Sequence, residues 1–168
     1  SYNANDWSPS HIAWKAYTQG LYAAALCDFD VLDGLEEFYG AGLLLPLRTC
    51  VNLETRAYLH EYSDVDITSP GEPGVTYIMG AGLPHVPPPA SPEGRQLAEY
   101  RQRAQERNVA LVDRINPQIE TVAIDYDEDV LPLAPLNAPT ERHIVRAYVK
   151  KARNFFGTDA AVAEYWAP

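Results

Sequence analysis

The chain has 168 residues, 46% of them hydrophobic, and a formal net charge of −10. This composition excludes an intrinsically disordered chain and predicts one domain, residues 1–168, with an ordinary apolar core. The charge is uneven, because residues 1–94 hold 12 acidic and three basic side chains, whereas residues 95–168 hold 11 and ten. An acidic first half argues against broad contact with phosphate backbones or anionic lipid, so we expect no nucleic-acid partner.

The sequence contains neither a run of about 20 apolar residues nor a basic-then-apolar leader, so we expect no membrane span. The two cysteines, Cys27 and Cys50, form no CxxC pair and lie in apolar stretches. This usage is typical of buried, reduced thiols. Together these features predict a soluble intracellular protein, in the cytoplasm or inside an organelle.

The first predicted helix begins at Ser8 and Pro9. Serine is a preferred N-cap residue and proline is favoured at the first helical position. Apolar residues then recur at helical spacing as far as residue 27, and we therefore expect one long helix. Its apolar positions are Ile12, Trp14, Tyr17, Leu21, Ala25, Leu26 and Cys27.

Two further helices are predicted before residue 60. The second begins at Asp30 and ends near Gly40, with Leu32, Leu35 and Phe38 at the spacing of a buried face. The third follows Pro46. It carries Val51, Arg56, Tyr58 and Leu59.

Residues 64–94 form a Pro/Gly-rich extended segment, with seven of the 14 prolines and five glycines. Only Val75–Met79 has the composition of a strand, and Pro87, Pro88 and Pro89 predict a short polyproline II rod. A loop of this length is uncommon in a compact domain. We expect it to be functional, to be held by a neighbouring protein, or to link two halves of the chain.

The last 78 residues of the sequence predict helices at both ends of an irregular region. Ser91 and Pro92 begin a helix that extends to Ile115 and is stopped by Pro117. One short strand over 118–124 and an extended arm over 131–139 follow. A fifth helix runs from Thr140 to Gly157, and a short one begins at Thr158. The predicted fold is therefore mainly α, with about five helical segments and at most a small β element.

An acidic cluster at Asp125, Asp127 and Asp129 is the candidate metal site. Alternating carboxylates can converge on a hard cation such as Ca²⁺. The calcium-loop pattern fails, because Val130 occupies the glycine position and Leu136 the position of the bidentate glutamate. A solvated acidic turn, or one that receives the basic face of the last long helix, is the favoured alternative, and we expect no cofactor.

Candidate catalytic residues are His60 with Asp64, and His85 in the Pro/Gly-rich segment. A histidine beside a carboxylate can act as an oriented general base. The alternative for His60 is a helix end at which the ring meets free carbonyl groups. Nucleophile elbows and phosphate-binding loops are absent from the sequence, so an enzyme is the less favoured hypothesis.

The favoured hypothesis is a non-catalytic interaction or assembly subunit of a larger complex. In it, extended Pro-rich arms and an acidic surface bind other protein subunits, some with basic surfaces. A small enzyme with a His/carboxylate site and an acidic inhibitor that blocks a cationic groove are the alternatives. The partner-binding residues expected are Asp33, Glu36, Glu37, Pro87, Pro88, Pro89, Tyr165 and Trp166.

Overall fold

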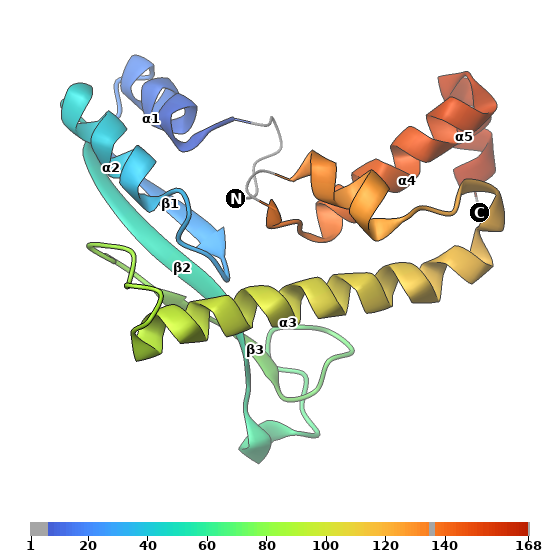
Figure 1. Cartoon of the computed structure of the whole chain (residues 1–168), viewed down its shortest axis with the longest axis horizontal. Coiled ribbons are helices and arrows are strands. Elements are labelled where there is room, and N and C mark those ends of the chain that lie inside the picture. The colour runs from blue at the N-terminus through green and yellow to red at the C-terminus, as the bar shows by residue number, and fades with distance from the viewer. Residues whose placement is uncertain (1–6, 135–136, 168) are drawn as a thin grey trace. The chain divides into compact units, whose positions relative to one another are not determined.

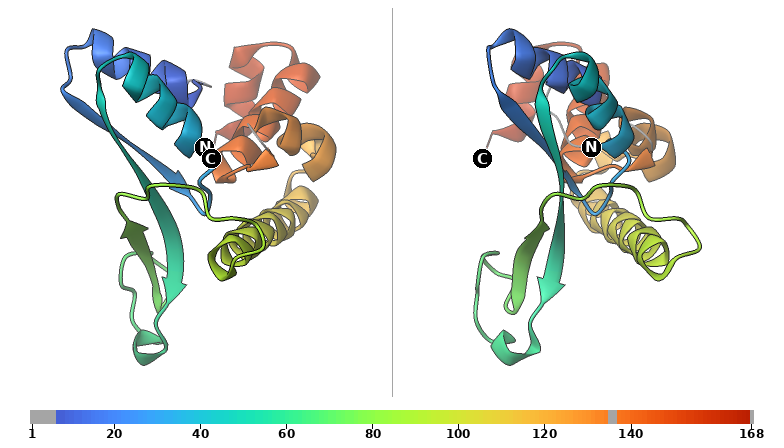
Figure 2. Two further views of the ribbon diagram at one scale, coloured as in Figure 1. Left: turned by 60° about the vertical axis from the view of Figure 1, so that its left-hand side comes forward. Right: turned by 90° about the vertical axis from the view of Figure 1, so that its left-hand side faces the viewer.

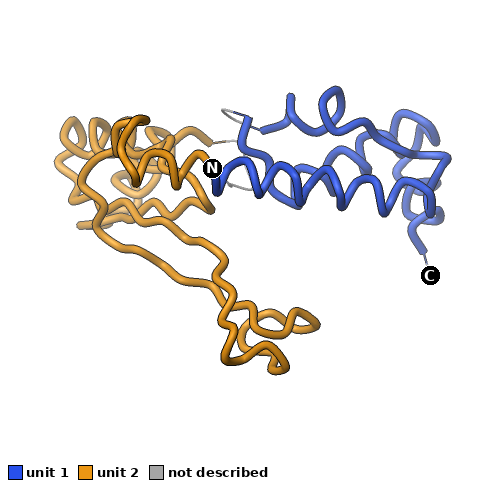
Figure 3. The backbone as a smooth tube through the Cα atoms, turned by 60° about the horizontal axis from the view of Figure 1, so that its bottom comes forward, with its two compact units in different colours: residues 1, 99–168 blue, residues 2–98 orange. Residues whose placement is uncertain are grey.

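The computed structural model describes residues 7–134 and 137–167. The chain divides into two compact units, which Figure 3 draws in different colours. The sheet unit comprises residues up to 98, and the helical unit comprises residues 99 onward. The boundary falls within α3 (Pro92–Ile115). Each unit is compact by itself, and the prediction of a single domain over residues 1–168 stays a prediction.

The prediction of a mainly α fold is wrong, because the sheet unit is built on a mixed three-stranded sheet of order β1-β2-β3. The molecule is an α/β protein. The first helix is α1 (Pro9–Thr18), capped by the Ser8 side chain, which accepts a hydrogen bond from the His11 amide. It ends nine residues earlier than expected, since Gly20 adopts φ 76° and turns the chain out of the helix.

Two segments predicted as helix are strands that pair in parallel. β1 (Ala23–Phe29) lies beside β2 (Arg48–Tyr58), with Leu26 opposite Val51. Burial alternates along β1, so one face of the strand is covered and the other is open. Figure 2 shows α1 and α2 (Leu35–Leu44) together on the covered side of this sheet.

The predicted strand at Val75–Met79 is confirmed as β3 (Val75–Gly80). It pairs antiparallel with the second half of β2, so that β2 and β3 form a ribbon that extends past β1 (Figure 1). The core of the sheet unit lies at the other end of β2. Phe38 of α2 has no exposed surface there, and Val51 is 1% exposed.

The helical unit confirms the predicted helices and corrects the region between them. The expected strand over 118–124 is instead two 3-10 turns, and the first residues of the expected extended arm form a third. Residues 135–136 of that arm lie outside the described residues. The elements are η2 (Asn116–Gln118), η3 (Glu120–Val122), the π-helix η4 (Tyr126–Val130), η5 (Leu131–Leu133), α4 (Glu141–Phe156) and α5 (Asp159–Trp166).

Apolar side chains from the irregular segments pack on α3 and α4 to form the core of the helical unit. Val130 has no exposed surface and Ile144 is 2% exposed. Among the described residues, no helix has both the length and the apolar character that crossing a membrane requires.

Candidate functional site

The carboxyl end of β1 carries two buried acidic side chains. Asp28 is 3% exposed and Asp30 is 5% exposed, and no other Asp or Glu among the described residues is buried. In open α/β sheets, ligands bind outside the carboxyl ends of parallel strands. Burying a carboxylate is costly unless it is paired or hydrogen-bonded, so its presence at this edge points to a function or to a specific structural contact.

Asp30 is held to β2 by its main chain and by its side chain. Its amide donates to the Glu54 carbonyl at 2.9 Å, and its Oδ1 accepts a hydrogen bond from the Thr55 hydroxyl at 2.7 Å. The residue adopts φ 62°, a left-handed conformation that aspartate tolerates better than most side chains. Non-glycine residues in this conformation cluster at functional sites.

Asp28 lies under the loop that leads from β1 to α2. A Cβ atom built on Gly34 would lie 3.3 Å from the Asp28 carboxylate and 2.9 Å from side-chain atoms of Leu26 and Pro9. A side chain at position 34 would therefore require the Leu26 and Pro9 side chains to move.

Glu54 lies on the opposite face of the sheet from Asp28. Leu26 and Val51 share the covered face, so the alternation of side chains along β2 places Glu54 on the open face with Cys27. Desolvation first, and then the negative charges of Glu54 and Asp28, raise the pKa of the Cys27 thiol. Cys27 is exposed, which corrects the expectation that both thiols are buried.

These carboxylates do not complete a metal centre. The strand geometry directs Asp28 and Glu54 to different faces, and Asp30 is engaged by Thr55. Nowhere among residues 7–134 and 137–167 do three His, Cys, Asp or Glu side chains come together as a group that could hold a metal. The edge therefore offers oxygen donors but, within the described residues, no complete ligand set.

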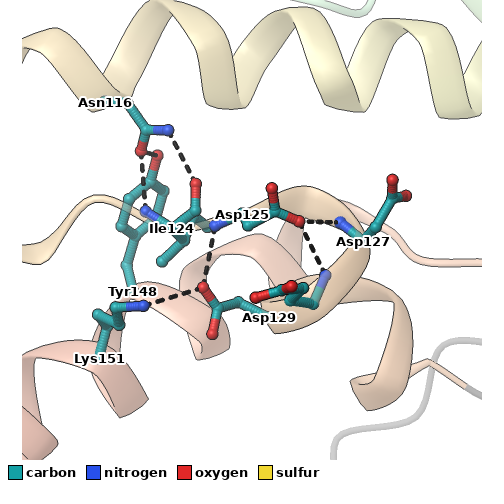
Figure 4. A network of polar contacts seen from close by, with 8 residues as sticks. Asn116, Ile124, Asp125, Asp127, Asp129, Tyr148 and Lys151 are labelled. Carbon is teal, nitrogen blue, oxygen red and sulfur yellow. Dashed lines mark hydrogen bonds and ion pairs between the residues drawn. The ribbon is translucent and has the colours of Figure 1, made fainter.

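Two of the three carboxylates in the acidic cluster, those of Asp125 and Asp129, accept main-chain hydrogen bonds (Figure 4). Asp125 Oδ1 accepts from the amides of Asp127 at 2.8 Å and Glu128 at 2.9 Å, and so caps the π-helix η4. Asp129 Oδ2 accepts from the Asp125 amide at 2.9 Å and from Lys151 Nζ at 3.2 Å. These contacts stabilise the turn, and the metal assignment stays a prediction.

The side-chain amide of Asn116 in η2 connects the loop at Ile124 with Tyr148 of α4. None of these residues was among the predicted site residues. Asn116 Nδ2 donates to the Ile124 carbonyl at 2.8 Å, and its Oδ1 accepts from the Ile124 amide at 3.1 Å. The Tyr148 hydroxyl of α4 donates to the same Oδ1 at 2.9 Å. The Asn-Pro pair after a helix was the local signal, but the partner residues are distant in sequence.

The three candidate catalytic residues are exposed side chains of the sheet unit. The ring of His60, in the 3-10 turn η1 (His60–Tyr62), meets Tyr58 edge-on with centroids 4.9 Å apart. Asp64 accepts a hydrogen bond from the Ser63 hydroxyl at 2.6 Å. None of the three lies at the carboxyl end of β1, and their catalytic roles stay predictions.

Several of the residues expected to bind partners also make intramolecular contacts. Glu37 accepts a hydrogen bond from the Ser10 amide at 2.9 Å, and the hydrogen bonds from Ser10 lower the pKa of the Glu37 carboxyl. The Pro88 carbonyl accepts from the Ser91 amide, and Tyr165 packs on Phe156. Asp33, Glu36 and Pro89 are exposed, Pro87 is half-buried, and Trp166 is 41% exposed. Binding by these residues stays a prediction.

The fold is similar to two solved structures. A provisionally assigned metal-dependent phosphoesterase from Bifidobacterium adolescentis matches 96% of this chain with a TM-score of 0.63 and 21% identity. An amidohydrolase from Chromobacterium violaceum, with bound sulfate and no metal, matches 94% with a TM-score of 0.56 and 15% identity. The chain spans about half the length of each, 53% and 48%. No protein-family model matches the sequence, and no curated protein does.

Proposed function

We propose that the chain is part of a hydrolase and that its active site lies at the carboxyl end of β1. The observation that carries the proposal is the pair of buried carboxylates, Asp28 and Asp30, at the edge where α/β enzymes bind their ligands. The likeness in fold to a phosphoesterase and an amidohydrolase supports the enzyme hypothesis over the non-catalytic subunit.

The two carboxylates suit different tasks in hydrolysis. Asp28 is the general base, which takes a proton from the water that attacks the substrate. Asp30 is a positioning residue, because the Thr55 hydroxyl and the β2 main chain already hold it. Cys27 is not the nucleophile in this proposal, since its raised pKa keeps the thiol protonated at neutral pH.

A phosphate ester is the proposed substrate class, on the likeness to the phosphoesterase. The negative charge of the phosphate group is repelled by the acidic residues at the carboxyl end of β1. Binding therefore needs a cation to offset this repulsion. A carboxylic amide carries no such charge and is the second candidate, on the likeness to the amidohydrolase.

The test is hydrolysis of aryl phosphate mono- and diesters and of aryl amides by the full chain, with and without added Mg²⁺, Mn²⁺ or Zn²⁺. We expect Asp28→Asn to lower the rate by about 100-fold or more, the usual effect of removing a general base. Glu36→Gln is the matched control, because it removes one acidic charge from an exposed position on α2. Equal rates in the parent and in a folded Asp28→Asn variant, or no hydrolysis by the parent, would overturn the proposal.

A further inference from the structure

A groove runs along α3 in the helical unit, with the segment from η4 to η5 as its other wall. Its volume is about 430 Å³. The helical side of the lining begins at Gln102 and ends at Asp113, a rise of about 16 Å at 1.5 Å per residue. The groove is therefore elongated, a shape that suits a peptide segment better than a compact small molecule.

The floor of the groove is apolar. Val109 and Ala110 of α3 face Tyr126 and Leu131 across it, and 38% of Val109 is exposed. Tyr126 is 9% exposed, and within the described residues its hydroxyl has no hydrogen-bond partner. An exposed apolar floor with polar walls is typical of a surface that binds an amphipathic segment.

The walls carry three acidic side chains, Glu106, Asp113 and Asp127, and no lysine or arginine lines the groove. None of the three forms an ion pair within the part of the chain that the structure describes, whereas the nearby Asp129 is paired with Lys151. Glu106 Oε1 accepts a hydrogen bond at 2.8 Å from the side-chain Nε2 of Gln102, which carries no charge to compensate that of the carboxylate.

We propose that this groove binds a basic amphipathic segment of a partner protein. One apolar side chain of the segment packs on Val109 and Leu131, and lysine or arginine residues on either side pair with Glu106 and Asp113. These two acids are seven residues apart on α3, or about 10 Å along its axis. Three acidic side chains and no lysine or arginine line the groove, so charge favours a basic partner segment. The proposal is independent of the hydrolase hypothesis.

The experiment measures binding of fluorescein-labelled synthetic peptides to the full chain by anisotropy. The probe is a Lys/Leu peptide with its leucines at helical spacing, and the comparison peptides are Lys/Ser and Glu/Leu versions of equal length. We expect the Lys/Leu peptide to bind and the other two to bind at least about 10-fold more weakly, because charge and apolar burial are both required.

Matched variants locate the site. Glu106→Gln combined with Asp113→Asn should weaken binding of the Lys/Leu peptide about 10-fold, and Val109→Ser should weaken it without any change in net charge. Glu120→Gln combined with Glu164→Gln removes the same charge from exposed positions outside the groove and should leave affinity within about twofold. Circular dichroism of each variant checks that its fold is retained.

Two results would overturn the proposal. Equal weakening by both double variants would mean that the peptide responds only to net charge. Sedimentation velocity of the parent protein tests for self-association. If the parent self-associates and the Glu106→Gln/Asp113→Asn variant does not, the occupant of the groove is a second copy of this chain.

Discussion

The two units of the molecule are stabilised in different ways. In the sheet unit, strand pairing gives the main-chain amide and carbonyl groups hydrogen-bond partners. The core of this unit consists of apolar side chains from α1, α2, β1 and β2. The helical unit has irregular backbone between α3 and α4, whose amide and carbonyl groups find no strand partner. There the side chains of Asn116, Asp125 and Asp129 bond to the main chain instead. Irregular backbone therefore needs specific polar side chains, because its buried polar groups must be paired.

The largest expected effect comes from the core of the sheet unit. Phe38 is fully buried, so Phe38→Ala should lower the free energy of unfolding of that unit by about 3–5 kcal/mol. Urea unfolding can be followed by tryptophan fluorescence for each unit. A Trp166→Phe background reports on the sheet unit through Trp7 and Trp14, and a Trp7→Phe/Trp14→Phe background reports on the helical unit.

Leu43→Ala, at an 86% exposed position on the same helix as Phe38, is the control and should change stability by less than about 0.5 kcal/mol. We expect Phe38→Ala to move only the transition of the sheet unit. If both transitions move together, the chain unfolds as one cooperative domain and the contrast between the units fails.

An intermediate effect is expected from the hydrogen bonds that Asn116 makes in the helical unit. Asn116→Ala leaves the Ile124 amide and carbonyl and the Tyr148 hydroxyl without their partner. Stability of the helical unit should fall by about 1–3 kcal/mol, the cost of unsatisfied buried polar groups, in the same urea experiment. Tyr148→Phe removes a single hydrogen bond and should cost about 1 kcal/mol. An Asn116→Ala variant as stable as the parent would show that water replaces the side chain.

The smallest expected effect depends on pH. Burial tends to raise the pKa of the Asp129 carboxyl, but the hydrogen bond from the Asp125 amide and the contact with Lys151 outweigh it and lower the pKa. A lowered pKa in the folded state contributes stability that is present above the unfolded pKa, about 3.8, and is lost as pH falls through the folded value. Asp129→Asn should therefore cost at most about 1 kcal/mol at neutral pH, since the side chain is 29% exposed.

This difference between parent and Asp129→Asn should close as the pH falls below about 4. Urea unfolding of the helical unit between pH 7 and pH 3 measures it, and Glu120→Gln serves as an exposed control. A difference that stays constant with pH would assign the effect to packing rather than to charge.

The helical unit was easier to predict than the sheet unit. Ser91, Pro92 and Pro117 are local signals for the start and end of a helix, and the helix predicted between them is confirmed as α3. The error in the sheet unit began at Gly20, whose position after Thr18 signals a helix end. The apolar residues of β1 maintain helical spacing beyond this glycine, and that spacing predicted a helix that continues through it.

The candidate site was missed for a related reason. Asp28 and Asp30 gain their significance from burial at the carboxyl end of a strand, and they look like surface acids when the segment is taken for a helix start. The alternation of Val51, Leu53 and Thr55 was the available signal for β2. Had β2 been recognised, the acids at the end of β1 would have been candidates as well.

Local sequence by itself determined the helix caps, the long amphipathic helices and the position of β3, because these depend on neighbours within a few residues. Only the tertiary structure decided that residues 23–29 and 48–58 pair as parallel strands. Alanine-rich and alternating apolar segments of this length fit either a helix or a strand, and the hydrogen bonds between distant strands favour the sheet. The same pairing places Asp28 and Asp30 next to β2, where both side chains are buried. No short stretch of the chain could specify this burial.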